Sequence, residues 1–127
     1  MSANRQFVDT NVLVYARDLT AGDKHDRARA LLEGLWDSRE GCLSIQVLQE
    51  FFVTTTHTIP KPLEASSAAR IIADLARWHV HAPDTRDVLA AIEIHQQTGA
   101  SFWHAMILRS AEELGCQLLH SEDLNHS

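Results

Sequence analysis

Four acidic residues, spread over nearly the whole sequence, could act together in metal-dependent chemistry. Asp9 interrupts an apolar stretch near the start, Glu50 lies in an amphipathic segment, and Glu122 and Asp123 follow a late apolar run. Carboxylates gathered at one point repel each other unless a cation lies between them, and such oxygen ligands hold Mg²⁺ or Mn²⁺. A cluster of this kind suits phosphodiester hydrolysis, because the metal activates water and a carboxylate can serve as general base.

Each of these acids also has a structural interpretation. A carboxylate among apolar residues must be solvated, paired or metal-bound, and Asp9 could instead cap the helix that follows it. Glu50 could be an exposed helix residue, and Glu122 and Asp123 could form a solvated tail. From the residues alone both interpretations stay open, and the sequence predicts an α/β domain with a candidate acidic metal site.

The expected secondary structure places the acids along one edge of a sheet. Short apolar strands are predicted to end at Asp9 and to cover residues 42–44, 78–83 and 116–119. Amphipathic helices are predicted over 24–37, 45–57, 64–78, from Asp84 or Thr85 to Gly99, and over 102–114. This alternation predicts a parallel sheet between helices, in which ligands bind outside the carboxyl ends of the strands.

Capping residues and apolar spacing set the expected helix boundaries and inner faces. Thr10 and Asn11 suit the cap of a short helix or turn over 12–16, Ser44 that of 45–57, and Ser101 that of 102–114. The apolar spacing places Trp36 on the inner face of the first long helix. It places Ile45, Leu48, Phe51 and Phe52 on the inner face of helix 45–57.

Composition limits the class of protein. The 127 residues predict a single domain over 1–127, and the 45% hydrophobic content is sufficient for a core. The net charge of −6 does not indicate a nucleic-acid binder, but a metal-dependent nuclease needs local acids and is not excluded. There is no apolar run of membrane-spanning length, no secretory leader and no glycine-rich phosphate loop. Cys42 and Cys116 lie in apolar runs and are expected to be reduced, in a cytoplasmic protein.

Four segments, in order and in register, resemble the PIN-domain ribonucleases, most closely the toxins of VapC-type toxin–antitoxin pairs. They are FVDTNVLVYA at the start, LSIQVLQEFF in the middle, SFWHAMI later and LLHSEDL at the end. The resemblance implies a PIN-like three-layer α/β/α fold with a mainly parallel central sheet. It also implies Mg²⁺- or Mn²⁺-dependent cleavage of RNA, a cognate antitoxin that blocks the site, and a homodimer.

The resemblance also implies roles for individual residues. Asp9, Glu50 and Asp123 match the catalytic and metal-binding acids of the family. Asn11, Ser101 and Glu122 are expected to support that site.

His104 departs from the family pattern, which has an aspartate at this metal-binding position. An imidazole presents one lone pair and no negative charge, so affinity for Mg²⁺ should fall while Mn²⁺ is better tolerated. Three interpretations stay open. His104 is a natural ligand in a Mn²⁺-tolerant nuclease, or it marks a weakened or inactive enzyme, natural or engineered, or it merely lies near the site.

Other expectations concern the end of the chain, the function and the partners. The resemblance predicts a further strand after S-E-D-L, so the sheet could lack its last edge strand. The alternative function is a catalytically inactive PIN-fold module that binds an antitoxin or RNA; a phosphatase or another Mg²⁺-dependent hydrolase is a weaker one. Candidate RNA contacts, which could equally form a solvated helix face, are Arg17, Lys24, Arg27 and Arg29. Residues suited to a core or a dimer interface are Leu31, Leu35, Trp36, Phe51 and Phe52.

Overall fold

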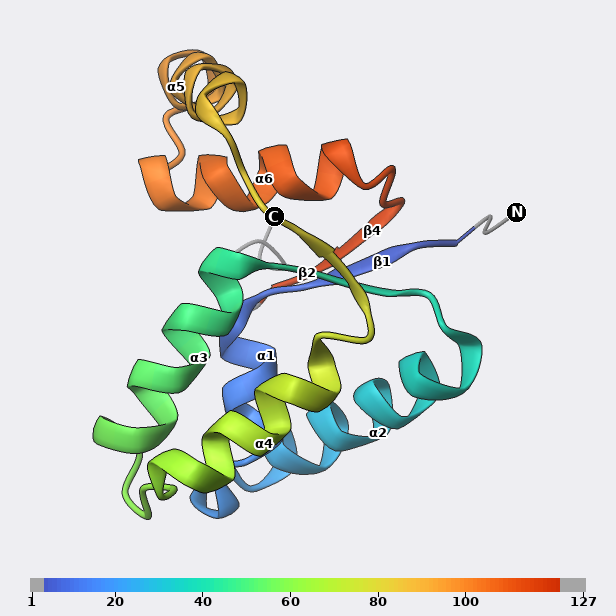
Figure 1. Cartoon of the computed structure of the whole chain (residues 1–127), viewed down its shortest axis with the longest axis vertical. Coiled ribbons are helices and arrows are strands. Elements are labelled where there is room, and N and C mark those ends of the chain that lie inside the picture. The colour runs from blue at the N-terminus through green and yellow to red at the C-terminus, as the bar shows by residue number, and fades with distance from the viewer. Residues whose placement is uncertain (1–3, 122–127) are drawn as a thin grey trace.

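The computed structural model describes residues 4–121, and four strands in that range form one fully parallel sheet (Figure 1). The strands are β1 (Gln6–Val8), β2 (Gly41–Ser44), β3 (His79–His81) and β4 (Leu118–His120). Their order is β3-β2-β1-β4, so β1 is central and pairs with both β2 and β4. The carboxyl ends of all four strands therefore lie at the same edge.

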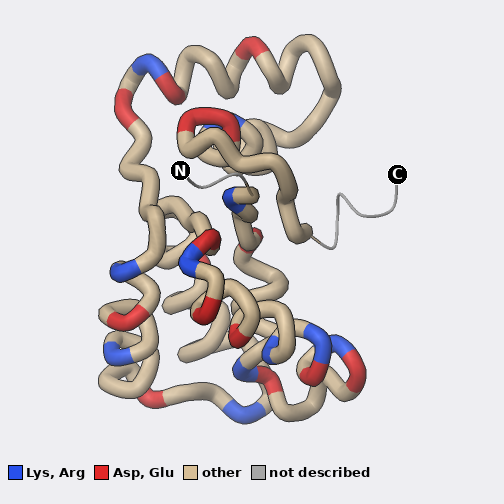
Figure 2. The backbone as a smooth tube through the Cα atoms, turned by 90° about the vertical axis from the view of Figure 1, so that its right-hand side faces the viewer, with Lys and Arg blue, Asp and Glu red and all other residues tan. Residues whose placement is uncertain are grey.

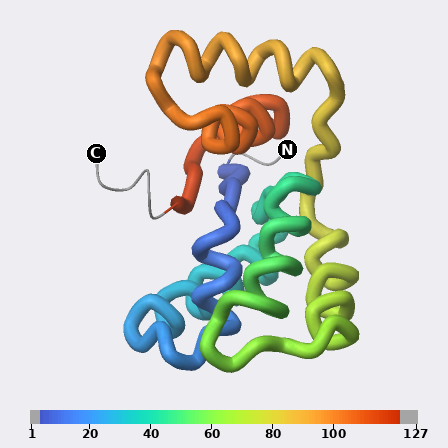
Figure 3. Tube along the Cα trace, turned by 90° about the vertical axis from the view of Figure 1, so that its left-hand side faces the viewer, coloured from blue at the N-terminus to red at the C-terminus, as the bar shows by residue number. Residues whose placement is uncertain are grey.

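Helices cover both faces of the sheet, which confirms the predicted three-layer α/β/α fold. They are α1 (Thr10–Tyr15), the 3₁₀ turn η1 (Leu19–Ala21), α2 (Asp23–Ser38), α3 (Ile45–His57), α4 (Ala65–Leu75), α5 (Thr85–Thr98) and α6 (Phe102–Glu113). Helices α1 to α4 lie on one side of the sheet, while α6 lies on the other with α5 outside it (Figures 1 and 3). Helix α5 thus packs mainly on α6.

The core lies where the two central strands meet both helical layers. Phe7 and Val8 of β1 and Cys42 and Leu43 of β2 are all fully buried. Burial on both faces explains why these strands are continuous apolar runs with no polar alternation. Burying each large side chain contributes about 1.5–3 kcal/mol, so β1 is anchored firmly up to its last residue, Val8, directly before Asp9.

Two predictions about helix boundaries had different outcomes. Ser44 caps α3 by accepting a hydrogen bond from the backbone N–H of Val47, as predicted. The prediction that Thr10 and Asn11 cap a helix starting at residue 12 is wrong, because α1 begins at Thr10 and its cap is Asp9. Asp9 has extended backbone angles (φ −77°, ψ 163°), which suit a cap, and the strand passes directly into the helix.

The predicted inner faces need correction at two residues. Trp36 is 38% exposed and Ile45 is 40% exposed, while Val47 and Thr55 are buried on α3. Trp36 packs edge-on against Trp78, with ring centroids 5.4 Å apart, and so joins α2 to the segment before β3 at the rim of the core. The Trp78 ring lies directly against Gly41, where an added Cβ would overlap it. Glycine at this position makes the close approach feasible.

Three further expectations concern the cysteines, membrane-spanning helices and the last strand. Both cysteines have free thiols, as predicted. No helix within residues 4–121 is long and apolar enough to cross a membrane. The expected strand after β4 lies outside the described residues.

Candidate active site

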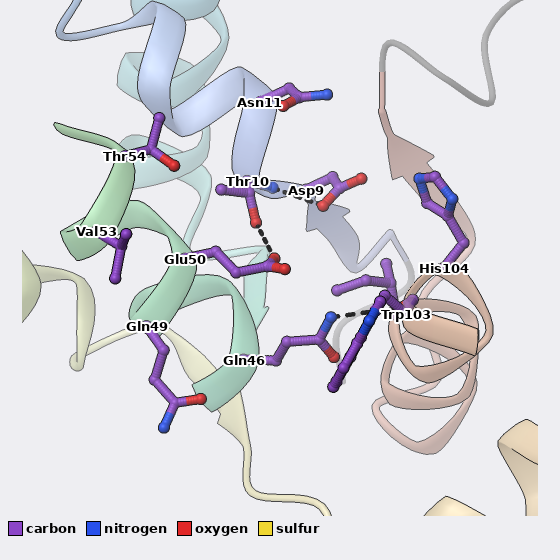
Figure 4. Close-up of a pocket in the computed structure, with 11 residues that line it drawn as sticks. Asp9, Thr10, Asn11, Gln46, Gln49, Glu50, Val53, Thr54, Trp103 and His104 are labelled. Carbon is purple, nitrogen blue, oxygen red and sulfur yellow. Dashed lines mark hydrogen bonds between the residues drawn. The ribbon is translucent and has the colours of Figure 1, made fainter. Parts of the chain in front are cut away.

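A pocket of about 510 Å³ opens at the carboxyl edge of the sheet, between α3 of one helical layer and α6 of the other (Figure 4). Asp9, Thr10 and Asn11 line it from the β1–α1 junction, Gln46, Gln49, Glu50, Val53 and Thr54 from α3, and Trp103, His104 and Ile107 from α6. This volume is within the usual range for ligand pockets, and the location is where parallel sheets bind ligands.

The Asp9 carboxylate is 5% exposed and is held from two directions. Its Oδ1 accepts a hydrogen bond from the backbone N–H of Thr10 at 2.6 Å. Its Oδ2 accepts one from the Ser121 hydroxyl at 2.9 Å, just after β4. Asp9 is therefore both the cap of α1 and a wall of the pocket, so the two interpretations of this residue are compatible.

Glu50 is joined to the same junction through Thr10. The Thr10 hydroxyl donates to Glu50 Oε1 at 2.7 Å, which links the first residue of α1 to the second turn of α3. Consecutive residues, Asp9 and Thr10, thus position two carboxylates at one edge of the sheet. Glu50 therefore lies at the carboxyl edge of the sheet, where the sequence places it, and its side chain points into the pocket (Figure 4).

His104 lies in the first turn of α6, and Ser101 orients it. The Ser101 hydroxyl oxygen accepts from the backbone N–H of His104 at 3.2 Å, which makes Ser101 the predicted N-cap. It also lies 3.1 Å from His104 Nδ1. When Nδ1 carries the proton and donates to Ser101, Nε2 carries the lone pair that a metal ligand needs, as in metal-binding histidines.

Three of the four predicted metal-binding residues therefore line one pocket: Asp9, Glu50 and His104. Asp123 and Glu122 lie outside the described residues. Within residues 4–121, no three acidic, histidine or cysteine side chains are grouped closely enough to hold a metal ion among themselves. The set nevertheless fits an ion such as Mg²⁺, which is usually bound by one or two carboxylates, with water and substrate completing its shell.

The charge of the pocket agrees with this fit. None of the described residues lining it is Lys or Arg, and His104 is the one basic side chain among them. Of the candidate RNA contacts, Arg17 and Arg29 line a separate pocket between α1, α2 and α4. Lys24 lies over the Tyr15 ring, 5.1 Å from its centroid. Elsewhere acidic and basic residues are interspersed along the helices (Figure 2).

A second buried carboxylate, Asp87 of α5, has a different environment. It accepts hydrogen bonds from the backbone N–H of Asp84 at 2.8 Å and from Arg109 Nε at 2.8 Å, and its Oδ2 lies 3.3 Å from His81 Nε2. His81 Nδ1 in turn lies 2.8 Å from the hydroxyl of the buried Ser110. These residues, called the Asp87 cluster below, join β3, α5 and α6.

The hydrogen bonds in the Asp87 cluster change the pKa of its members. The backbone N–H of Asp84 is the main factor that holds the pKa of Asp87 below its usual value, and Arg109 and His81 add to it while burial opposes it. The hydrogen bond to Asp87 raises the pKa of Arg109 above its usual value. Both shifts favour the charged forms, so Asp87 and Arg109 pair as carboxylate and guanidinium.

Sequence reasoning missed three residues of the pocket region. Ser121 was not considered, although it lies next to the predicted acids. The sequence pattern indicates Thr10 only as a cap, and it does not single out Trp103. An exposed aromatic beside a predicted site residue was the signal available for Trp103; the partners of Thr10 and Ser121 come from distant parts of the chain, so no local signal existed.

Comparisons with known proteins agree with the fold. The PIN domain family model matches residues 7–127, and the chain belongs to the PIN domain family. No match was found among curated proteins.

Two solved structures are similar to this chain over nearly its whole length. One is a toxin–antitoxin complex from Klebsiella pneumoniae, with a TM-score of 0.70, 17% identity, and coverage of 96% of this chain and 90% of the other. The second is VapC20 of Mycobacterium tuberculosis, a toxin that cleaves the sarcin–ricin loop, with a TM-score of 0.70, 20% identity, and coverage of 95% and 93%. At these identities the likeness concerns the fold.

Proposed function

We propose that this chain is a metal-dependent endoribonuclease that acts as the toxin of a toxin–antitoxin pair, working as a single PIN domain. The observation that carries the proposal is the junction of β1 and α1. There Asp9 and Thr10 place two carboxylates in one pocket whose described lining contains no Lys or Arg. Membership of the PIN family and the similarity to two toxin structures support this assignment.

Asp9, Glu50, His104 and Asp123 are the residues proposed to hold Mg²⁺ or Mn²⁺. When bound, the ion would supply a more acidic water and offset charge on the phosphate. Asp9 contributes a carboxylate whose orientation is set by Thr10 and Ser121. Outer hydrogen bonds of this kind fix a ligand's orientation and raise its effectiveness.

The other residues position the water and the RNA. Glu50 or Asp123 would act as general base toward the attacking water, and Thr10 keeps Glu50 facing the pocket. Asn11 lines the pocket and offers an amide to the phosphate, and Ser101 holds the His104 ring. Glu122 would assist its neighbour Asp123.

His104 favours a second candidate function, an inactive PIN-fold module that binds an antitoxin or RNA. Replacing a family carboxylate by imidazole removes one negative charge and two oxygen ligands. Cleavage of RNA with Mn²⁺ and with Mg²⁺ by this chain, by His104→Asp and by Asp9→Ala separates the two functions. Cleavage by the parent chain, stronger with Mn²⁺ and lost in Asp9→Ala, is the expected result.

The other outcomes of this experiment are equally informative. Activity that appears only in His104→Asp identifies the parent as the inactive module. Equal cleavage by the parent and by Asp9→Ala would show that the carboxylate site is wrongly assigned.

Two protein partners belong to the same proposal. An antitoxin would block the pocket, as the toxin–antitoxin neighbour suggests. A second copy would pack on the outer face of α5, where Val88 is 36%, Leu89 60% and Ile92 37% exposed on one helix face. By contrast, Leu35 and Phe51, considered for an interface from sequence, are core residues at 3% and 1% exposure. Light scattering tests this interface. The parent chain should have the mass of a dimer, and Leu89→Arg should have the mass of a monomer.

A further inference from the structure

Trp103 is a large aromatic residue that the core does not use. It is the second residue of α6 and is 63% exposed, although covering an indole would be favourable. Its neighbour Phe102 packs against a small cluster of Ala91, Ala105 and Met106. The indole therefore has its surface available for something other than folding.

The indole is nevertheless held in place. Its ring lies edge-on to Phe102, with centroids 5.2 Å apart and planes at 68°. The backbone carbonyl of Trp103 accepts a hydrogen bond from Gln46 Nε2 at 3.3 Å, which ties the start of α6 to α3 across the pocket. A positioned aromatic surface loses little conformational freedom when a ligand stacks on it.

Trp103 lines the same pocket as the two carboxylates (Figure 4). It precedes His104 directly, so the indole and the proposed metal ligand leave the same turn of α6. A phosphate placed at Asp9 and Glu50 would bring a neighbouring base of the same strand toward this wall. Gln46 and Gln49 on α3 offer amide groups across from it.

The charge of the pocket limits how RNA can be held there. Nucleic acids are usually held by Lys and Arg on their phosphates, but the described lining of this pocket has neither. Stacking of bases on aromatic side chains is the other common source of affinity, and it needs a base that is not paired. Both observations favour a single strand over a duplex.

We propose that Trp103 is a stacking platform for one unpaired base of a single-stranded RNA, beside the phosphate that the Asp9 pocket receives. The inference rests on the proposed function and specifies how its substrate is held. Trp103 acts in this scheme as a positioning residue, and the amides of Gln46 and Gln49 contact the edge of the stacked base.

Equilibrium binding of a fluorescein-labelled single-stranded RNA tests the platform. Fluorescence anisotropy is measured with Ca²⁺ in the buffer to offset the acidic charge of the pocket, and a gel checks that the RNA stays intact. Trp103→Ala should weaken binding about 5- to 150-fold, the range for loss of one stacked base, and Trp103→Phe should weaken it less. Leu118→Ala is the matched control. Leu118 is 53% exposed at the amino end of β4, the end away from the pocket, so this variant should bind the RNA as the parent chain does.

A second comparison uses the RNA itself. A blunt-ended, fully paired RNA duplex of the same composition should bind the parent chain no better than it binds Trp103→Ala. With a single strand that carries one abasic nucleotide at the contacted position, the Kd values of the parent chain and of Trp103→Ala should become nearly equal. Thermal unfolding of each variant verifies that an exposed substitution leaves the fold intact.

The outcomes separate this inference from the proposed nuclease. If single strands bind and Trp103→Ala loses affinity while no variant cleaves RNA, the platform stands and the nuclease function fails. If the parent cleaves RNA and Trp103→Ala has the same KM and Kd, the platform is refuted and the nuclease stands. Absence of single-strand binding by the parent chain refutes the platform.

Discussion

Asp9 and Asp87 are two carboxylates with nearly the same burial, 5% and 4% exposed, and both lie at the N-terminal end of a helix. Asp87 is surrounded by Arg109 and His81 as well as a backbone N–H. The hydrogen bonds described for Asp9 come from neutral donors, the backbone of Thr10 and the hydroxyl of Ser121. Asp87 therefore has its countercharge within the fold, whereas neither of the two described hydrogen bonds to Asp9 supplies one.

This difference supports a structural role for Asp87 and the proposed metal-binding role for Asp9. A buried ion pair that is fully hydrogen-bonded holds elements together and leaves little capacity for a ligand. A buried carboxylate with only neutral donors keeps its negative charge available to an incoming cation. Burial alone does not make this distinction; the charge of the partners does.

The largest expected effect comes from Asp9→Asn. Asparagine caps helices about as well as aspartate, so thermal stability should change little. RNA cleavage should fall by about 100-fold or more, because loss of a ligand should exceed the 10- to 100-fold typical of outer-shell changes. Cleavage assays and thermal unfolding on the same preparations check both parts. If Asp9→Asn lost much thermal stability but kept its RNA cleavage, Asp9 would have a structural role like that of Asp87.

Asp87→Asn should have the opposite profile. The amide removes the negative charge that Arg109 and His81 face, and we expect a loss of about 2 kcal/mol in the free energy of unfolding. Cleavage per folded molecule should stay at the parent level, because the Asp87 cluster lies outside the pocket. Urea unfolding and cleavage assays measure the two quantities. Lower cleavage at unchanged stability would contradict the structural role.

Low pH should reduce the contribution of the Asp87 carboxylate to the free energy of unfolding. Because the pKa of Asp87 is lowered in the fold, its stabilising effect is complete above its unfolded value of about 3.9 and is lost as the pH falls through the folded value. The stability difference between the parent and Asp87→Asn should therefore narrow on going from about pH 7 to about pH 3.5. Urea titrations at both pH values measure it. A difference that stays constant would show that charge on Asp87 is not what stabilises the cluster.

The smallest effect is expected from Arg86→Ala. Arg86 lies 3.3 Å from Asp84, but the two side chains are 86% and 55% exposed. An exposed pair of this kind should change the free energy of unfolding by less than about 0.5 kcal/mol. This variant is the control for Asp87→Asn, since it removes an ion pair of the same helix at the surface. If Arg86→Ala lowered the free energy of unfolding as much as Asp87→Asn does, burial would not explain the difference between the two ion pairs.

The sequence was sufficient for the parts of this fold that local patterns encode. The apolar run before Asp9, the cap at Ser44 and the cap at Ser101 each depend on residues a few positions apart. The contacts that complete the site are long-range: Thr10 to Glu50 spans 40 residues and Ser121 to Asp9 spans 112. Periodicity does not contain such pairings, so the location of Asp9 could be predicted but not its partners.

The same limit explains the wrong boundary and the missed cluster. The sequence offers a cap and a site residue as alternatives for Asp9, whereas in the structure one carboxylate oxygen caps α1 and the other accepts a hydrogen bond from Ser121. The Asp87 cluster joins three elements through side chains that are individually ordinary in sequence. Only the packing of β3, α5 and α6 brings them together.

The central position of β1 has a consequence for the order in which the chain is made. Asp9 leaves the ribosome early, but β1 pairs with β4, and the hydroxyl that fixes its carboxylate comes 112 residues later. Domain folding during synthesis proceeds from the N-terminus. The pocket is therefore assembled only after nearly all of the described chain has emerged, so a ribosome that makes this protein carries an incomplete site for most of the time of translation.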